Sequence, residues 1–432
     1  MIHDLAQDLN ATLNDTVVGN MMSPLGTRLY FPKGIIAQSG EAKKLGKTAN
    51  GTIGMGCVNE MPLILPCIQS QLPNLRADEI VAYAPTAGDN ELREFWKKKI
   101  LEKNPDLQNK MFSLPVVVPG LTAGIAYLCD LFLPENETLI ATNPSWDNYT
   151  LIVTARNNAN LVQFPMFDNH RFNIAGFKSV IDKEAETGKI RLLLNFPHNP
   201  SGYSPTTDEI KEICAVLRAA AEKGTHIMVW CDDAYFGLNY EKNIERQSIF
   251  AFLADIHENI LAVKLDGPTK EDYVWGFRTG FLTFAGKGLQ ENHYDAIIQK
   301  LMGAIRSSVS CCTTMSQTIM KKTLSNPNLE QEKHAFFEIL EERYQKVRSF
   351  LETKKEHEVL EPLPFNSGYF MSFLCKKVNA EELRQKLLHE HGIGIIAIDD
   401  QIIRVAFSSI DTELIESVYE TLYACAMDLL RA

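Results

Sequence analysis

The chain has 432 residues, 45% of them hydrophobic and 22% charged, and its 43 Lys and Arg against 54 Asp and Glu leave a net charge of −11. This apolar content excludes disorder as the main state, and the length suffices for two or three domains with their own cores. The acidic balance argues against nonspecific binding to nucleic acid or anionic membranes but leaves room for a small anion in a local pocket. We expect a globular protein with small-molecule partners, no nucleic acid and no membrane.

Cysteine usage and the N-terminus bear on the compartment. The nine cysteines include no C-x-x-C pair, and Cys311 and Cys312 are adjacent, which suits neither a disulfide framework nor a zinc site. Residues 1–20 carry early acids and lack an apolar signal segment. The apolar stretch 114–134 is broken by prolines, glycines and an aspartate, so a strand followed by a helix explains it better than a membrane span. We expect a cytoplasmic protein with reduced thiols and no metal.

Along the chain, the first seventy residues show no strong periodicity, and we expect them to wrap around the C-terminal part. The middle alternates helical patterns, for example 206–223, with short apolar runs. These runs are continuous, as in strands buried on both faces, and predict a mostly parallel sheet with helical crossovers. The predicted strands are 116–118, 138–142, 161–164, 191–195, 227–231, 260–264 and 280–284.

The last hundred residues have a different pattern. A long charged amphipathic helix is predicted over 328–354, and Pro362 and Pro364 then break the chain. Short strands near 369–373, 395–398 and 402–407 surround a helix at 380–390. We predict a large α/β domain over residues 74–318 and a smaller α+β domain built from residues 1–73 and 319–432.

Polar side chains follow five of the predicted strands. Ligands of open parallel sheets bind beyond the carboxyl ends of the strands, so these residues are candidates for one site. The glycine turn 119–124 opens a helix and offers backbone N–H groups and a hydroxyl to an anion such as phosphate. The other strand ends contribute Trp146, Asn199, the pair Asp232 and Tyr235, and Lys270 with Arg278 eight residues later.

Taken alone, each of these residues has an ordinary explanation. A lone lysine is usually a solvated surface residue, a lone tryptophan belongs to the core, Asp232 could cap a helix, and 199–202 could be a simple turn. Their order together suits a flat aromatic cofactor with a phosphate tail and an aldehyde. Pyridoxal 5'-phosphate needs a lysine for its Schiff base, an acid for its pyridinium nitrogen, an aromatic face and a phosphate cradle. The pattern predicts this cofactor.

These residues also resemble a known family. From about Asn50 to the C-terminus, the chain is similar to the pyridoxal-phosphate-dependent aminotransferases of fold type I, class I/II, in particular the aspartate and aromatic branch. The most specific segments are 143–146, 199–202, 232–235, 270–278 and 403–407. The resemblance implies a large domain with a seven-stranded, mostly parallel sheet, a smaller α+β domain, and a homodimer with shared active sites.

The resemblance further implies the role of each residue. Lys270 would form the Schiff base and move a proton, Asp232 would pair with the ring nitrogen, and Tyr235 would bond the phenolic oxygen. The cofactor would also contact Asn199, Trp146, the Leu121 amide, Thr122, Thr269, Arg278 and, from the neighbouring subunit, Tyr83. The substrate would contact Arg404 through its α-carboxylate and would lie near Gly56, Trp146 and Asn199.

Two positions need comment. Lys264 is the rival for the Schiff base, but it lies inside a predicted strand and lacks the eight-residue spacing to Arg278. Gly267 departs from the family pattern, which often has Ser or Thr there, so one hydroxyl contact to the phosphate is missing.

Arg306 is the one substrate clue with chemical content. Residues 304–308 are similar to the segment from which aspartate aminotransferases extend an arginine across the dimer to the distal carboxylate of the substrate. The alternative is a surface or phosphate-side arginine. The first interpretation predicts a 2-oxo acid acceptor such as 2-oxoglutarate and an acidic or aromatic/large neutral L-amino acid donor.

We therefore expect a ping-pong aminotransferase. The main alternative is a β-eliminating lyase or a decarboxylase on the same fold, because residues that hold the cofactor do not separate these reactions. A ligand-responsive DNA-binding regulator is disfavoured, since the seventy residues before the large domain show no helix-turn-helix pattern and no basic cluster.

Overall fold

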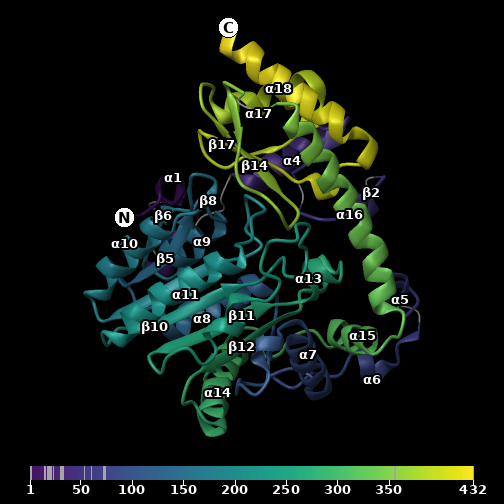
Figure 1. Ribbon diagram of the computed structural model, residues 1–432. Coiled ribbons are helices and arrows are strands. Elements are labelled where there is room, and N and C mark those ends of the chain that lie inside the picture. Colours follow the sequence, from purple (N-terminus) through teal and green to yellow (C-terminus); the bar gives the residue numbers. More distant parts are fainter. Residues whose placement is uncertain are drawn as a thin grey trace.

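The computed structural model of the chain describes residues 2–13, 16, 22, 24–29, 34–52, 54–59, 61–71, 74–354 and 357–431. Two units, each built around a sheet, lie one above the other, and the long helix α16 (Leu329–Glu352) runs from the lower unit into the upper one (Figure 1).

The lower unit contains a seven-stranded sheet in the order β4-β12-β11-β10-β9-β5-β6. β12 (Gly280–Gly286) runs antiparallel to both neighbours, and the other six strands are parallel to one another. Those six are β4 (Val116–Val118), β5 (Thr138–Asn143), β6 (Asn160–Pro165), β9 (Lys189–Asn195), β10 (His226–Asp232) and β11 (Ile260–Asp266). The seven predicted strands are confirmed, and each observed strand is at most two residues longer than predicted.

The sheet is buried because helices pack against it. Contacts reach it from α8 (Leu121–Phe132), α10 (Ile174–Ala185), α11 (Thr207–Glu222) and α12 (Ile249–Leu253). This covering explains why β4 and β12 are buried at every residue rather than at alternate ones. The remaining elements around the sheet are α6 (Ala77–Ile80), α7 (Asn90–Lys103), α9 (Asn148–Thr150), β7 (Phe167–Asp168), β8 (Arg171–Phe172), α13 (Pro268–Glu271), α14 (Glu291–Ser308) and α15 (Thr314–Leu324).

The upper unit is an antiparallel sheet in the order β13-β14-β17-β16, with helices beside it. Its strands are β13 (Leu360–Pro362), β14 (Met371–Cys375), β16 (Ile396–Ala397) and β17 (Ile402–Val405). Its helices include α17 (Ala380–His391) and α18 (Ile415–Arg431). The strand predicted at 369–373 begins at residue 371. The rings of Tyr369 and Phe370, which precede it, pack against Tyr235 of the lower unit.

The N-terminal segment contacts both units, not the C-terminal one alone. α4 (Ile35–Leu45) and β1 (Ala49–Asn50) join the upper unit, where β1 pairs in parallel with β15 (Ile393–Gly394). α3 (Pro24–Arg28) reaches the lower unit instead, because the Arg28 Nε donates to the Ala155 carbonyl at 3.0 Å. α1 (Asp4–Leu13), β2 (Cys57–Val58), β3 (Met61–Pro62) and α5 (Pro66–Gln69) complete this segment. The domain division at residues 74–318 stays a prediction.

The structure bears on the cysteines, on membrane-spanning helices and on groups of metal-binding side chains. All nine cysteines are free thiols. None of the helices in the described part of the chain has the length and apolar character that a membrane crossing requires. Over the same residues, no group of three or more His, Cys, Asp or Glu side chains is placed to hold a metal ion.

A buried carboxylate, that of Glu209, lies in the first turn of α11. Glu209 accepts hydrogen bonds from the Thr206 N–H and hydroxyl, the Tyr203 hydroxyl and the Phe172 N–H, at 2.7 to 3.0 Å. Burial would raise its pKa, but the hydrogen bonds from Thr206, Tyr203 and Phe172 outweigh burial, so the pKa of Glu209 is lowered. This capping box also ties α11 to the hairpin β7–β8.

We predict that Glu209→Gln lowers the free energy of unfolding by about 1–3 kcal/mol near neutral pH, since donors facing a charged oxygen lose their partner. The lowered pKa means that the wild-type advantage is complete above the unfolded pKa of about 4.3 and disappears as the pH falls through the lower folded value. Urea unfolding from pH 3 to 7 checks this. Glu212→Gln, on the same helix, is the control, and an equal effect of both variants would contradict the prediction.

Candidate active site

A cavity opens at the carboxyl edge of the large sheet, and most of the predicted residues line it. They are Leu121, Thr122, Trp146, Asn199, Asp232, Tyr235, Thr269, Lys270 and Arg278. Counting the residues that follow each strand predicted them correctly, because six parallel strands end at this edge of the sheet. The antiparallel β12 begins at the same edge, two residues after Arg278. The sequence analysis missed Ile125, Tyr149, Asn195 and Ala234.

Asp232 is the last residue of β10 and is buried. The Tyr149 hydroxyl donates to its Oδ2 at 2.5 Å, and the Ala234 N–H donates to its Oδ1 at 3.2 Å. Burial raises the pKa of Asp232, while the Tyr149 hydrogen bond and the charge of Lys270 oppose this rise. A carboxylate with so little water gains from a cationic partner in the cavity.

Lys270 lies in the short helix α13 and lines the cavity. Burial lowers the pKa of its amine to about 8; the carboxylate of Asp232 opposes this shift and the cation of Arg278 adds to it. The Nζ lies 4.7 Å from the centre of the Tyr235 ring. A lysine with this pKa is partly unprotonated near neutral pH and is therefore available as a nucleophile and a base.

Lys264 has a different environment, although it lies only six residues earlier. Its Nζ is buried within β11 and forms ion pairs with Asp233 and, at 3.4 Å, with Asp266. Burial opposes the charge, but these two carboxylates outweigh burial and raise the pKa of Lys264. A lysine held as a paired cation is a poor nucleophile, and it does not line the cavity.

The part of the cavity next to the start of α8 suits an anion. α8 begins at Leu121, so its free N–H groups point into this end, where Thr122, Thr269 and Arg278 also lie. Gly120 has φ +87°, and a Cβ there would lie 2.1 Å from the Arg278 Nη2. A side chain at 120 would therefore displace the arginine.

The structure explains why position 267 lacks a hydroxyl side chain. A Cβ at Gly267 would approach the Thr279 carbonyl oxygen to 2.9 Å and the Gly280 Cα to 3.0 Å. Both are backbone atoms and cannot rotate away. Serine or threonine at 267 therefore requires the backbone before β12 to move.

Arg404 of β17 comes to this site from the upper unit. Its Nη1 donates to the Asn199 Oδ1 at 3.0 Å and its Nη2 to the Thr52 carbonyl at 3.1 Å, and its guanidinium stacks 4.3 Å from the centre of the Phe370 ring. Its Nε is buried without a hydrogen-bond partner. The guanidinium keeps donors for a carboxylate, and Asn199 keeps its amide NH₂ for the cavity.

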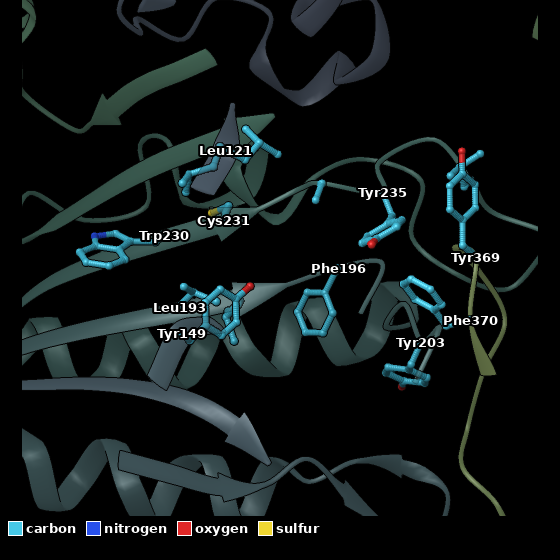
Figure 2. Close-up of a cluster of buried hydrophobic side chains, with 14 of the residues drawn as sticks. Leu121, Tyr149, Leu193, Phe196, Tyr203, Trp230, Cys231, Tyr235, Tyr369 and Phe370 are labelled. Carbon is cyan, nitrogen blue, oxygen red and sulfur yellow. The ribbon is translucent and has the colours of Figure 1, made fainter. Parts of the chain in front are cut away.

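Aromatic rings join the two units around the site. Figure 2 shows Tyr235 beside Phe370 and Tyr369, and their ring centres lie 5.4 and 5.6 Å from that of Tyr235. The Tyr369 hydroxyl donates to the Lys270 carbonyl at 2.8 Å. Burial raises the pKa of Tyr235, so its hydroxyl remains a proton donor.

Four of the predicted residues do not line the cavity: Arg404, which is bonded to Asn199 of the lining, and Gly56, Tyr83 and Arg306. A Cβ at Gly56 would face Leu63 and Tyr273, whereas one at Gly54 would lie 3.6 Å from the Tyr235 hydroxyl oxygen, so Gly54 is the nearer glycine. Tyr83 is 92% exposed. Arg306 is exposed and donates to the Ser310 hydroxyl at 2.5 Å. Their roles stay predictions.

Together, the fold and the site define a pyridoxal-phosphate enzyme. The residues fit the cofactor on three observations: a lysine amine with a lowered pKa, a buried carboxylate that lacks a full countercharge, and a helix N-terminus with an arginine for the phosphate. Beside the cavity, the Nε of Arg404 is buried without a hydrogen-bond partner, and the Nη1 of Arg404 is bonded to the cavity residue Asn199.

The comparison with known proteins identifies the family. Residues 57–422 match the family model "Aminotransferase class I and II", and the chain belongs to this pyridoxal-phosphate-dependent family. The chain is 22% identical over 365 residues to the probable N-acetyl-LL-diaminopimelate aminotransferase of Bacillus subtilis, covering 82% of this chain and 80% of that protein.

Solved structures support the fold. An aminotransferase from Anaerococcus prevotii superposes with a TM-score of 0.83 at 21% identity, covering 94% of this chain and 99% of that one. The kynurenine aminotransferase of Pyrococcus horikoshii, solved with PMP, has a TM-score of 0.78 at 17% identity and covers 98% of this chain and 100% of that one. The predicted fold type and family are therefore confirmed.

We predict that Tyr149→Phe lowers kcat/KM at pH 7 by roughly three- to tenfold, the effect of one net hydrogen bond. Loss of the hydroxyl raises the pKa of Asp232 further, so the acid limb of the pH profile moves to higher pH. Steady-state kinetics from pH 5 to 9 measure both effects. Tyr127→Phe, which removes a hydroxyl bonded to Ser308 outside the cavity, is the control. An unmoved acid limb in Tyr149→Phe would contradict the prediction.

Proposed function

We propose that this aminotransferase moves the amino group of an acidic or aromatic/large neutral L-amino acid to a 2-oxo acid such as 2-oxoglutarate by ping-pong chemistry. The observation that carries the proposal is the placement of Lys270 and Asp232 on one cavity, with Arg404 bonded to the Asn199 of that cavity. An amine, a carboxylate and a guanidinium in this arrangement suit an α-amino acid bound beside the cofactor.

The proposed roles follow from the positions of the side chains. When bound, pyridoxal phosphate supplies a ring that withdraws electrons from the substrate Cα. Asp232 would hold the proton on the ring nitrogen, because its buried charge favours a cation there. Asn199 and Tyr235 would donate to the phenolic oxygen, and Trp146 would stack on the ring. Phosphate contacts would come from the Leu121 amide, Thr122, Thr269 and Arg278.

Lys270 and Arg404 would act on the substrate. Arg404 would orient the α-carboxylate as a two-pronged donor, which fixes the direction of the Cα–H bond. Lys270 would first hold the cofactor aldehyde. The free amine of Lys270, with a pKa of about 8, would remove the proton from the substrate Cα and deliver it to the carbon that carries the cofactor aldehyde.

We predict that Lys270→Ala lowers turnover by at least about a thousandfold, because both covalent attachment and proton transfer are lost. In the wild-type holoenzyme, borohydride should fix the cofactor to one lysine, and mass spectrometry of the peptides should identify it as Lys270. Full turnover of Lys270→Ala, or a label on Lys264, would contradict the proposal.

A homodimer with shared sites is also part of the proposal. Apolar side chains are exposed on neighbouring segments: Val81 (78%), Tyr83 (92%), Val309 (46%) and Met315 (44%). These segments contact one another, since the Thr314 hydroxyl donates to the Ala82 carbonyl at 2.5 Å. Arg306 is bonded to Ser310 next to this group. A second copy covering this surface would bring Tyr83 and Arg306 to its partner's site.

Mixing two inactive variants tests the shared site. We predict that Arg306→Ala loses turnover with dicarboxylic substrates while keeping turnover with phenylalanine and pyruvate, neither of which has a distal carboxylate. In a hybrid of one Arg306→Ala subunit and one Lys270→Ala subunit, one of the two sites has an intact Lys270 and an intact Arg306 from the neighbouring subunit. About half of randomly mixed dimers are hybrids, so mixing should restore about a quarter of wild-type turnover with dicarboxylic substrates. An unchanged Arg306→Ala would refute the carboxylate role of Arg306, and absence of recovery on mixing would refute the sharing.

A further inference from the structure

A second cleft lies next to the segment that carries Lys270. It has a volume of about 330 Å³ and shares no lining residue with the cofactor cavity. Its walls include residues 236–239, which directly follow Tyr235, and Glu271, which directly follows Lys270. The remaining wall comes from α7, α16 and the residues Arg246 and Tyr273, which lie outside both helices.

The lining of this cleft combines apolar rings with basic side chains. The apolar residues are Phe236, Leu238, Tyr273 and Phe337, and the basic residues are Lys103, Arg246, Lys333 and His334. Such a mixture suits a ligand that has both an apolar body and a negative charge.

The acids in and behind the cleft do not balance the cations. Lys333 lies 2.8 Å from Asp272 and 3.1 Å from Glu271, and Lys103 pairs with the same Glu271. Lys99 lies 4.0 Å from Asp272 and 3.6 Å from Glu330.

The three carboxylates thus pair with the three lysines, and the guanidinium of Arg246 lies outside these pairs. His334 pairs with Glu338 at 3.5 Å. Across the described residues, no hydrogen bond or ion pair involves the guanidinium of Arg246; only its backbone N–H is bonded, to Glu245.

Two polar groups in the cleft have room for an anionic partner: Lys103, which is already paired with Glu271, and Asn239. Burial lowers the pKa of Lys103 well below its usual value, and the nearby cations Lys333 and Lys99 lower it further. The Asn239 Oδ1 is buried without a hydrogen-bond partner. A rotation of that amide by 180° would present its NH₂ to the cleft instead. An anion would satisfy both groups.

We propose that this cleft binds an organic monocarboxylate with an aromatic or branched apolar body. The carboxylate would meet Arg246 and Lys103, and the apolar body would pack against Phe236 and Phe337. One negative charge matches the guanidinium of Arg246, which is unpaired among the described residues, and the rings provide the apolar contact that inorganic phosphate would not use. This binding does not depend on the proposed reaction.

Calorimetry on the holoenzyme with benzoate as the probe tests the proposal. Benzoate should bind saturably at one site per chain outside the active site, and inorganic phosphate and benzyl alcohol should each bind at least about tenfold more weakly, since each lacks one half of the contacts. Absence of saturable benzoate binding, or equal binding of phosphate, would overturn the proposal.

Variants locate the bound probe. Arg246→Ala removes a side chain without a partner, so the chain should fold normally and benzoate should bind at least about tenfold more weakly. Lys98→Ala, an exposed lysine on α7, should leave binding unchanged. Arg404→Lys should also retain it. Binding lost in Arg404→Lys but kept in Arg246→Ala would place benzoate in the active site and overturn the proposal. Transaminase turnover of Arg246→Ala, measured in parallel, reports on the proposed function separately.

Discussion

The burial of one carboxylate at the end of a central strand organises this molecule. Asp232 lies opposite Asn195 of β9 and Leu265 of β11, so the sheet holds it from both sides. A charge removed from water needs partners, and the Tyr149 hydroxyl, the Ala234 N–H and the amine of Lys270 supply them. The remaining demand for positive charge faces the cavity, which is why the site suits a cationic ring nitrogen.

The two lysines near this carboxylate show how burial and neighbours decide chemistry. Lys264 is surrounded by Asp233 and Asp266, which raise its pKa and keep it a structural cation. At Lys270 burial outweighs the charge of Asp232, Arg278 adds to the effect of burial, and the pKa falls to about 8. Residue type is therefore no guide to reactivity here, because two adjacent carboxylates outweigh burial at Lys264 whereas burial prevails at Lys270.

The substrate side of the site depends on segments that are far apart in the chain. Arg404 of the upper unit bonds Asn199 of the lower unit and the carbonyl of Thr52 from the N-terminal segment. Tyr369 likewise bonds the backbone of Lys270. The two units therefore meet through hydrogen bonds at the cavity itself, and a change in how they pack would move the guanidinium relative to the amine.

The sequence by itself determined the seven strands, the cofactor and most of the cavity lining, because apolar runs bury themselves and parallel strands bring their carboxyl ends to one edge. It did not identify Tyr149 or Asn195, whose partner Asp232 is distant in the chain. Sheet pairing brings Asn195 next to Asp232, and the packing of α9 brings Tyr149 there. It also did not explain Gly267, whose missing side chain reflects the close approach of the Thr279 carbonyl. Those features depend on distances between segments, and only the packed tertiary structure sets such distances.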